Sequence, residues 1–178
     1  GTTIQTLGNP DATWEVSTKA NYGLELGLFN DFTLIVDLFR EKRTGIFMQR
    51  RSVSASQGYT GVLPYANVGA VKNRGIDLSF EYNKAFNKDW ILSLRGSFTY
   101  AHNEITERDE PIGTPKYQSE IGHPINSILG LVSDGLFTDQ ADIDSSPKQT
   151  YQTVRPGDIK YLDLNGDGQI DDNDMTFL

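Results

Sequence analysis

A regular alternation of apolar and polar side chains runs through the first hundred residues and constrains the fold more than any other feature. Between Trp14 and Leu28, every second residue is apolar or small, and the residues between them are mostly charged, polar or glycine. Side chains of a β-strand point alternately to its two faces, so this pattern predicts a strand with one apolar and one polar face. The predicted strand covers about 15 residues, well beyond the usual length of about 5–6 in globular proteins.

Three further segments carry the same pattern, with apolar rows that begin at Phe32, Ile76 and Trp90. The turn signals Asn30-Asp31 and Asn87-Lys88-Asp89 separate the strands within each pair. The segment 44–71 between the pairs is rich in Ser, Gly and Tyr and predicts a long loop. The sequence therefore predicts an all-β fold, with four long antiparallel strands in two hairpins over residues 1–103.

The remainder of the chain, residues 104–178, loses the alternation and changes in charge. It carries a net charge of −10, whereas residues 1–103 carry +2. We expect a long loop region here that ends in an Asp-rich segment. The acidic balance argues against a nucleic-acid partner, because a phosphate backbone needs a basic surface. The absence of cysteine excludes disulfides and thiolate metal sites.

Two architectures fit the alternating strands. One is an antiparallel sheet with one face on a core and the other in water. The other is part of a transmembrane β-barrel, whose strands turn apolar residues to lipid and polar residues to the lumen. Trp14, Trp90 and Tyr100 stand near strand ends, as aromatic girdles do. In the barrel interpretation the two short turns face the periplasm, and segment 44–71 and everything after Asn103 face outside.

One motif near the C-terminal end has definite chemistry. Residues 163–174, with the sequence DLNGDGQIDDND, follow the twelve-residue calcium loop, with oxygen side chains at positions 1, 3 and 5 and glycine at position 6. We expect a structural Ca²⁺ site; its predicted ligands are Asp163, Asn165, Asp167, the Gln169 carbonyl, Asp171 and Asp174. Position 12 is Asp rather than the usual Glu, which shortens its reach. The alternative is an Asx-rich surface turn that binds nothing.

Other candidate residues carry weaker signals. No nucleotide-binding, nucleophile-elbow or zinc-protease motif is present, and nothing surrounds His102 or His123 in sequence to suggest catalysis, so we expect no enzyme. A basic cluster would lie just outside the membrane in the barrel interpretation, within reach of anionic lipid; it comprises Arg40, Lys42, Arg43, Arg50 and Arg51. The favoured interpretation of this cluster is a solvated extension of the strands, because charge runs usually mark solvated faces.

Four segments, in order along almost the whole chain, resemble the SusC-type nutrient transporters among the TonB-dependent outer-membrane receptors of Bacteroidetes. They are 9–15 (NPDATWE), 67–77 (NVGAVKNRGID), 122–124 (GHP) with 134–137 (DGLF), and 156–161 (PGDIKY) followed by 163–174. Ala70 and Lys72 depart from the Lys and Glu expected at these positions. The resemblance favours the barrel over the soluble sheet.

The resemblance implies that the chain is a fragment of the C-terminal third of a barrel of about 22 strands. The parent protein would import oligosaccharide or peptide across the outer membrane, powered through TonB and paired with a SusD-type surface lipoprotein. Polar residues would then line the barrel interior: Glu15, Lys19, Glu25, Asp37, Asp77, Glu81 and Arg95. The alternative function is that of a free-standing secreted β-sandwich binding module with a structural calcium.

An open four-stranded piece would leave its apolar face bare. This face includes Leu24, Leu26, Leu34, Leu78, Leu92 and Phe98. Burial of each such side chain is worth roughly 1.5–3 kcal/mol, so in isolation we expect a second copy or the loop after Asn103 to cover the face.

Overall fold

The structure is a computed structural model that describes residues 8–53 and 63–178. The chain divides into two compact units. The first contains the residues up to 111 together with 121–125, and the second contains 112–120 together with 126–178.

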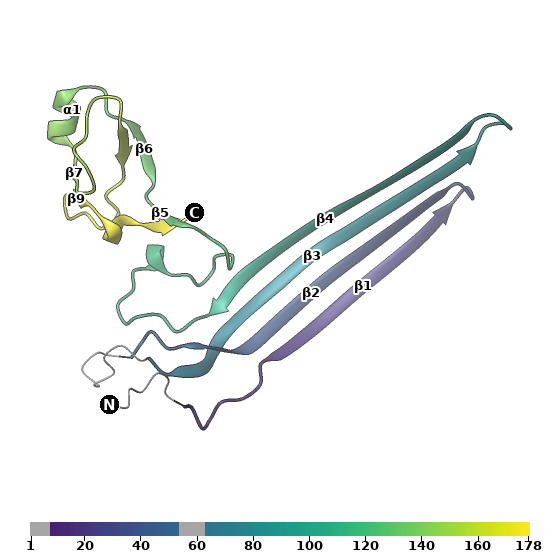
Figure 1. The fold of residues 1–178 in the computed structure, drawn as a ribbon, viewed down its shortest axis with the longest axis horizontal. Coiled ribbons are helices and arrows are strands. Elements are labelled where there is room, and N and C mark those ends of the chain that lie inside the picture. Colours follow the sequence, from purple (N-terminus) through teal and green to yellow (C-terminus); the bar gives the residue numbers. More distant parts are fainter. Residues whose placement is uncertain (1–7, 54–62) are drawn as a thin grey trace, which may run out of the picture. The chain divides into compact units, whose positions relative to one another are not determined.

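Four long antiparallel strands form a single sheet in the first unit, in the order β1-β2-β3-β4 (Figure 1). Their bounds are β1 Val16–Leu28, β2 Phe32–Gln49, β3 Tyr65–Ala85 and β4 Ile91–Glu107. Each strand pairs with the next one along the chain, so the topology is a simple meander. The predicted all-β fold with two hairpins is confirmed, and the strands are 13 to 21 residues long.

The two hairpins close at the same end of the sheet. Phe29 and Asn30 both have positive φ, of 58° and 60°, and the Asp31 amide donates to the Leu28 carbonyl at 3.3 Å. Positive φ at both central residues is what the tightest hairpin turns require. The Asn83 amide donates to the Asp31 carbonyl, which ties this turn to β3.

At the opposite end, β2 and β3 run further than their apolar rows suggest. β2 continues to Gln49 and β3 begins at Tyr65, so the expected loop over 44–71 is too long. The ladder shifts register between Arg43 and Ile46, where Gly45 adopts a φ of +67°. A β-bulge with glycine at positive φ lets paired strands bend without ending, which explains why the loss of alternation there did not end the strands. β4 likewise extends past the expected boundary at residue 103, to Glu107.

The second unit consists of short elements. They are η2 Lys116–Gln118, β5 Leu129–Gly130, β6 Ser133–Leu136, α1 Gln140–Ser145, β7 Lys148–Gln149, β8 Ile159–Tyr161, β9 Gln169–Ile170, η3 Asp172–Asp174 and β10 Thr176–Phe177. The strands form three two-stranded ladders: β6 with β8 and β5 with β10, both antiparallel, and β7 with β9, parallel. Its buried side chains are few, led by Phe137, Ile170 and the carboxylate residue Asp174. In the described parts of the chain, no helix is long and apolar enough to cross a membrane.

Candidate functional site

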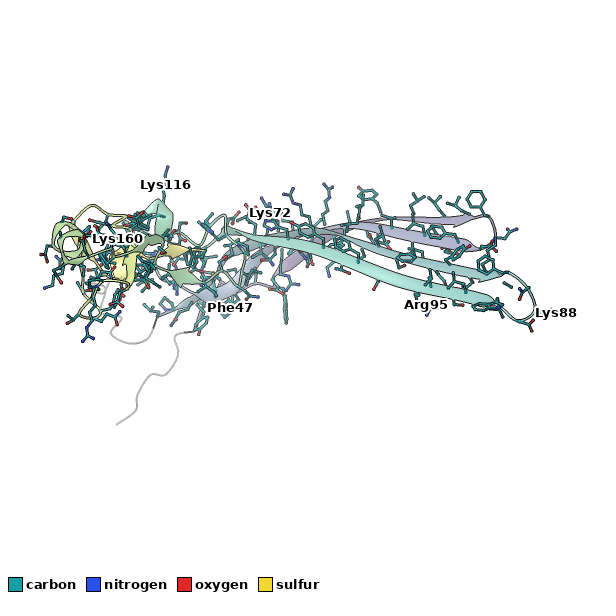
Figure 2. All side chains as sticks on the ribbon, turned by 90° about the horizontal axis from the view of Figure 1, so that it is seen from above. Phe47, Lys72, Lys88, Arg95, Lys116 and Lys160 are labelled. Carbon is teal, nitrogen blue, oxygen red and sulfur yellow. The ribbon has the colours of Figure 1, made fainter. Side chains whose placement is uncertain are left out.

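Cross-strand register gives the sheet one apolar face, here called the outer face. Leu38 stands opposite Tyr22 and Ile76, and Ile76 stands opposite Tyr100, so the apolar rows of all four strands align. In β4 the row runs over nine residues, from Leu92 to Tyr100, which is the length of strand that crosses a bilayer. Figure 2 shows side chains projecting from both sides of the strands.

The outer face is exposed. Leu24 is 55% and Phe98 is 59% accessible. The expectation that a second copy or the loop after Asn103 covers this face stays a prediction, and the later segment forms short ladders of its own. A bare row of this size is normal where lipid supplies the apolar contact.

The opposite face, here called the inner face, carries the polar residues expected to line a barrel. The register joins Lys19 to Glu41 and Glu81 to Arg95 as direct cross-strand neighbours. Their side chains form ion pairs of 3.8 Å and 3.1 Å. The remaining predicted lining residues, Glu25, Asp37 and Asp77, occupy positions of the same face. Opposite charges directly across a ladder stabilise the sheet, as in the pairs of Lys19 with Glu41 and of Glu81 with Arg95, whereas Asp37 and Asp77 stand opposite each other as like charges.

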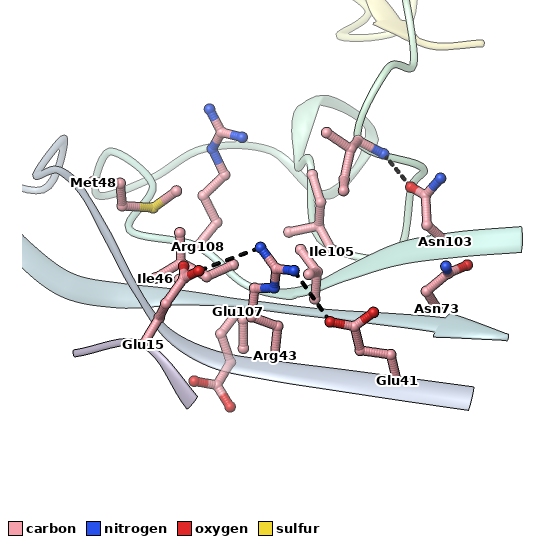
Figure 3. A pocket seen from close by; sticks show the side chains of 14 residues that line it. Glu15, Glu41, Arg43, Ile46, Met48, Asn73, Asn103, Ile105, Glu107 and Arg108 are labelled. Carbon is pink, nitrogen blue, oxygen red and sulfur yellow. Dashed lines mark hydrogen bonds and ion pairs between the residues drawn. The ribbon is translucent and has the colours of Figure 1, made fainter. Parts of the chain in front are cut away.

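A hollow of about 470 Å³ lies next to Glu41, at the end of the sheet where β2 and β3 extend (Figure 3). Arg43 lies between two carboxylates there, 3.3 Å from Glu15 and 3.2 Å from Glu41. The apolar part of the wall comes from Ile46, Met48, Ile105 and Ile125. The buried amide oxygen of Asn73, also in the wall, has no hydrogen-bond partner within the described residues. The hollow thus combines an arginine paired with two glutamates, an apolar wall and an amide oxygen without a partner in the described residues.

Asp109 fastens the end of β2 to the segment after β4. Its carboxylate accepts hydrogen bonds from the Arg51 amide at 2.6 Å, the Ser52 amide at 2.9 Å and the Ser52 hydroxyl at 2.7 Å. Burial would raise the pKa of Asp109, but these bonds and the nearby Arg50 outweigh it and hold the pKa below its usual value. The carboxylate is therefore a fixed anchor for the start of the connection to β3.

The structure separates the predicted basic cluster. Arg43 lies on the inner face, and Arg50 lies 3.6 Å from Asp109. Arg40 and Lys42 remain together on the outer face, where the register sets them directly opposite Arg74 and Lys72. Sequence reasoning missed this pairing because the register of β2 against β3 depends on where the two strands end, and the alternation of side chains did not show that they extend to Gln49 and from Tyr65.

The Asp-rich loop folds around the side chains that were predicted as calcium ligands. The Asp163 carboxylate accepts hydrogen bonds from the amides of Gly166 and Gly168, at 2.6 and 2.8 Å. These bonds lower the pKa of Asp163, and the bond from Gly168 has the larger effect. Asn165 and Asp167 each accept from the amide two residues on. Gly168, at the predicted turn position, has a φ of +82°. The backbone of Gln169 enters β9.

The end of the loop is fixed by its two last predicted ligands. Asp174 is fully buried, and its carboxylate accepts from the amides of Leu164, Asn165 and Asp171 at 2.9–3.2 Å. Asp171 caps η3 by accepting from the Asn173 amide. Within residues 8–53 and 63–178, no group of three or more His, Asp or Glu side chains is arranged to hold a metal ion. The calcium site therefore stays a prediction.

Comparison with known proteins covers nearly the whole chain. The model of the family "TonB dependent receptor-like, beta-barrel" matches residues 1–173. TonB-dependent receptor P39 of Formosa agariphila is 27% identical over 97% of the chain, and TonB-dependent receptor SusC of Bacteroides thetaiotaomicron is 24% identical over 93%. Among solved structures, the RagAB peptide importer in its open-open state is similar over 100% of the chain, with 25% identity and a TM-score of 0.70.

The two-faced sheet of long antiparallel strands is thus a section of an outer-membrane β-barrel. The chain belongs to the TonB-dependent receptor β-barrel family. SusC, whose type its sequence motifs resemble, is among the relatives that it matches. It spans about a fifth of the length of these relatives, 20% of P39 and 19% of the RagAB chain.

Proposed function

We propose that the chain is one section of a longer transporter that takes up a nutrient across the outer membrane. The observation that supports this most directly is the contrast between the two faces of one sheet, apolar outside and ion-paired inside. This contrast is what a strand between lipid and a polar lumen requires. The parent protein would draw energy through TonB and work with a SusD-like surface lipoprotein.

The substrate class in this proposal is peptide or oligosaccharide, with peptide favoured by the RagAB importers that the chain resembles. The inner-face hollow supports this proposal through its size and its mixed lining, which combines charged side chains of both signs with an apolar wall. Transport rather than catalysis is the role of such a surface.

Uptake by cells tests the proposal. Deletion of the gene that encodes the full-length receptor should abolish uptake of a labelled peptide mixture or of a labelled oligosaccharide mixture, and the wild-type gene should restore it. Unchanged uptake of both mixtures in the deletion strain would contradict the proposed function.

We also propose that the Asp-rich loop binds Ca²⁺. The donor set supports this: carboxylates, an amide oxygen and a backbone carbonyl are the hard oxygen ligands that calcium prefers. The positive φ of Gly166 and Gly168 turns the chain sharply around Asp163. When bound, the ion would connect the residues before β9 to η3 and rigidify the loop.

Hydrogen exchange of the purified full-length receptor tests the calcium proposal. Calcium at about 100 times its Kd should slow exchange in segment 163–174 by about a hundredfold, since a ligand bound only to the closed state stabilises it. Asp163→Asn should remove the effect, whereas Asp134→Asn, an equal charge change outside the loop, should retain it. Equal exchange in calcium and in chelator would show that the loop is only an Asx-rich turn.

A further inference from the structure

The outer face carries a basic patch immediately beyond its apolar rows. We define it as Arg40 and Lys42 of β2 together with Lys72 and Arg74 of β3. All four side chains are exposed, and they occupy the same face as Leu38 and Ile76, the next apolar residues along the two strands.

The patch places like charges directly opposite each other. Arg40 pairs with Arg74 and Lys42 with Lys72 in the ladder, an arrangement that destabilises a sheet by itself. The same sheet pairs Lys19 with Glu41 and Glu81 with Arg95 on its inner face. The outer patch is therefore a concentration of four positive charges, and the inner face has its own like-charge neighbours in Asp37 and Asp77.

Little within the described residues balances this charge. Lys72 lies 2.8 Å from Glu104, whereas Arg40, Lys42 and Arg74 form no ion pair in the part of the chain that the structure describes. His102 stands opposite Arg74, on the side away from Arg40. A hollow of about 470 Å³ lies beside the four bases, bordered on β1 by the small side chains of Thr18 and Ala20; Lys19 and Glu41, which pair with each other, also line it. An anionic group has room to enter it.

The position of the patch identifies the kind of anion. Tyr22 and Tyr100 end the apolar rows, where membrane-interface aromatics belong, and the patch begins two residues further along the strands. The short hairpin turns lie at the other end of the strands. In bacterial barrels such turns face the periplasm, so the patch stands at the level of the outer-leaflet headgroups.

We propose that the basic patch binds phosphate groups of anionic lipid headgroups in the outer leaflet. This inference rests on the proposed barrel orientation and adds a lipid site outside the transport path. Arginine suits phosphate because its planar guanidinium donates two parallel hydrogen bonds, and the two lysines add point charges. Lipid phosphate would convert the cross-strand repulsion into attraction.

Native mass spectrometry of the detergent-purified full-length receptor tests the site. The probes are lipid A and the same lipid A with its phosphates removed, so that the acyl chains are identical. The wild type should retain the phosphorylated lipid preferentially. Arg40→Gln/Arg74→Gln should weaken its binding by about thirtyfold, the equivalent of ~1 kcal/mol for each basic residue lost at a charged surface.

Two control variants separate charge from packing. The inner-face control, Arg95→Gln combined with Lys88→Gln in the β3–β4 turn, removes two charges at the far end of the strands and should bind both lipids as the wild type does. Arg40→Lys/Arg74→Lys keeps the charges and should retain most of the preference. Equal binding of the two lipids to the wild type, or an equal loss in the inner-face control, would overturn the proposal. Displacement of the lipid by millimolar inorganic phosphate would also overturn it, in favour of a free-phosphate site.

Fractionation of the same cells distinguishes failure of the lipid site from failure of the barrel. A receptor that is present in the outer membrane but shows no preference for lipid phosphate contradicts the lipid site alone. A receptor that is absent from the outer membrane contradicts the proposed function as well.

Discussion

Single carboxylates fix the ends of the long strands and of the loops. The carboxylate of Asp109 accepts three hydrogen bonds from Arg51 and Ser52. The fully buried carboxylate of Asp174 accepts hydrogen bonds from three backbone amides. Asp142 has the same role in the second unit. Its carboxylate lies 2.9 Å from the Lys160 ammonium, which lowers the pKa of Asp142, and this ion pair joins α1 to β8.

The hydroxyl of Tyr151 donates a hydrogen bond to Asp172. Burial and this hydrogen bond raise the pKa of Tyr151 to about 12, so the hydroxyl stays a donor.

The Asp109 anchor gives a pH-dependent prediction. Asp109→Asn should weaken the protection of the Ser52 amide by about 2 kcal/mol, because charged acceptors form the stronger hydrogen bonds. The folded-state pKa of Asp109 lies below its usual 3.8. The extra protection that the Asp109 carboxylate gives the Ser52 amide, relative to Asn, is therefore fully present above pH 3.8. It is lost as the pH falls through the lower folded-state pKa.

Hydrogen exchange of the full-length receptor between pH 3 and pH 7 (an interval of ~4 pH units around the usual carboxyl pKa) measures this difference. Asp89→Asn, in the β3–β4 turn, is the matched control and should leave Ser52 unchanged. An Asp109→Asn variant with wild-type exchange at neutral pH would show that the anchor contributes nothing.

At the scale of the strands, two glycines of the sheet pack closely against aromatic rings. A Cβ atom on Gly75 would lie 2.3 Å from the Tyr100 carbonyl oxygen and 2.4 Å from the Phe39 ring. A Cβ atom on Gly96 would lie 2.4 Å from the Phe80 ring, and its three nearest atoms all belong to that movable side chain. Gly75 therefore meets fixed backbone, whereas Gly96 meets a side chain that can rotate.

We accordingly expect Gly75→Ala to destabilise the barrel by about 1–3 kcal/mol, the usual cost of overpacking, and Gly96→Ala to cost less. The temperature at which the folded receptor loses its compact migration in gel electrophoresis gives the ranking. Gly27→Ala, where a Cβ would have no neighbour within 4 Å, is the control. A Gly75→Ala variant as stable as Gly27→Ala would refute the close approach.

The strands and their hairpins were predictable because a period of two and the turn signals at Asn30 and Asn87 are local properties. The register was not, and it decides which residues meet. The like-charge neighbours across the ladder, Arg40 with Arg74 and Lys42 with Lys72, depend on how β2 and β3 align around the bulge at Gly45. The two-residue ladders of the second unit were missed for a related reason: pairs so short carry no periodicity.

At the scale of the whole molecule, the exposed outer face requires something outside the sheet to cover its apolar side chains. A sandwich would cover it with a second sheet, and a barrel leaves it to lipid. The match to TonB-dependent receptors over residues 1–173 decides for the barrel. In a barrel the inner-face ion pairs face the lumen. The proposed orientation then puts the basic patch at the level of the lipid headgroups.

Site-directed spin labelling of β3 in the full-length receptor, reconstituted into bilayers, tests this account most directly. This chain contributes no cysteine, so single cysteines at positions 76–82 give clean labelling sites in it. We predict that collisions with oxygen, which concentrates in lipid, are high at Ile76, Leu78, Phe80 and Tyr82 and low at Asp77, Ser79 and Glu81. Uniform oxygen accessibility along β3, or maxima at the second set, would contradict a strand with its apolar face in the membrane.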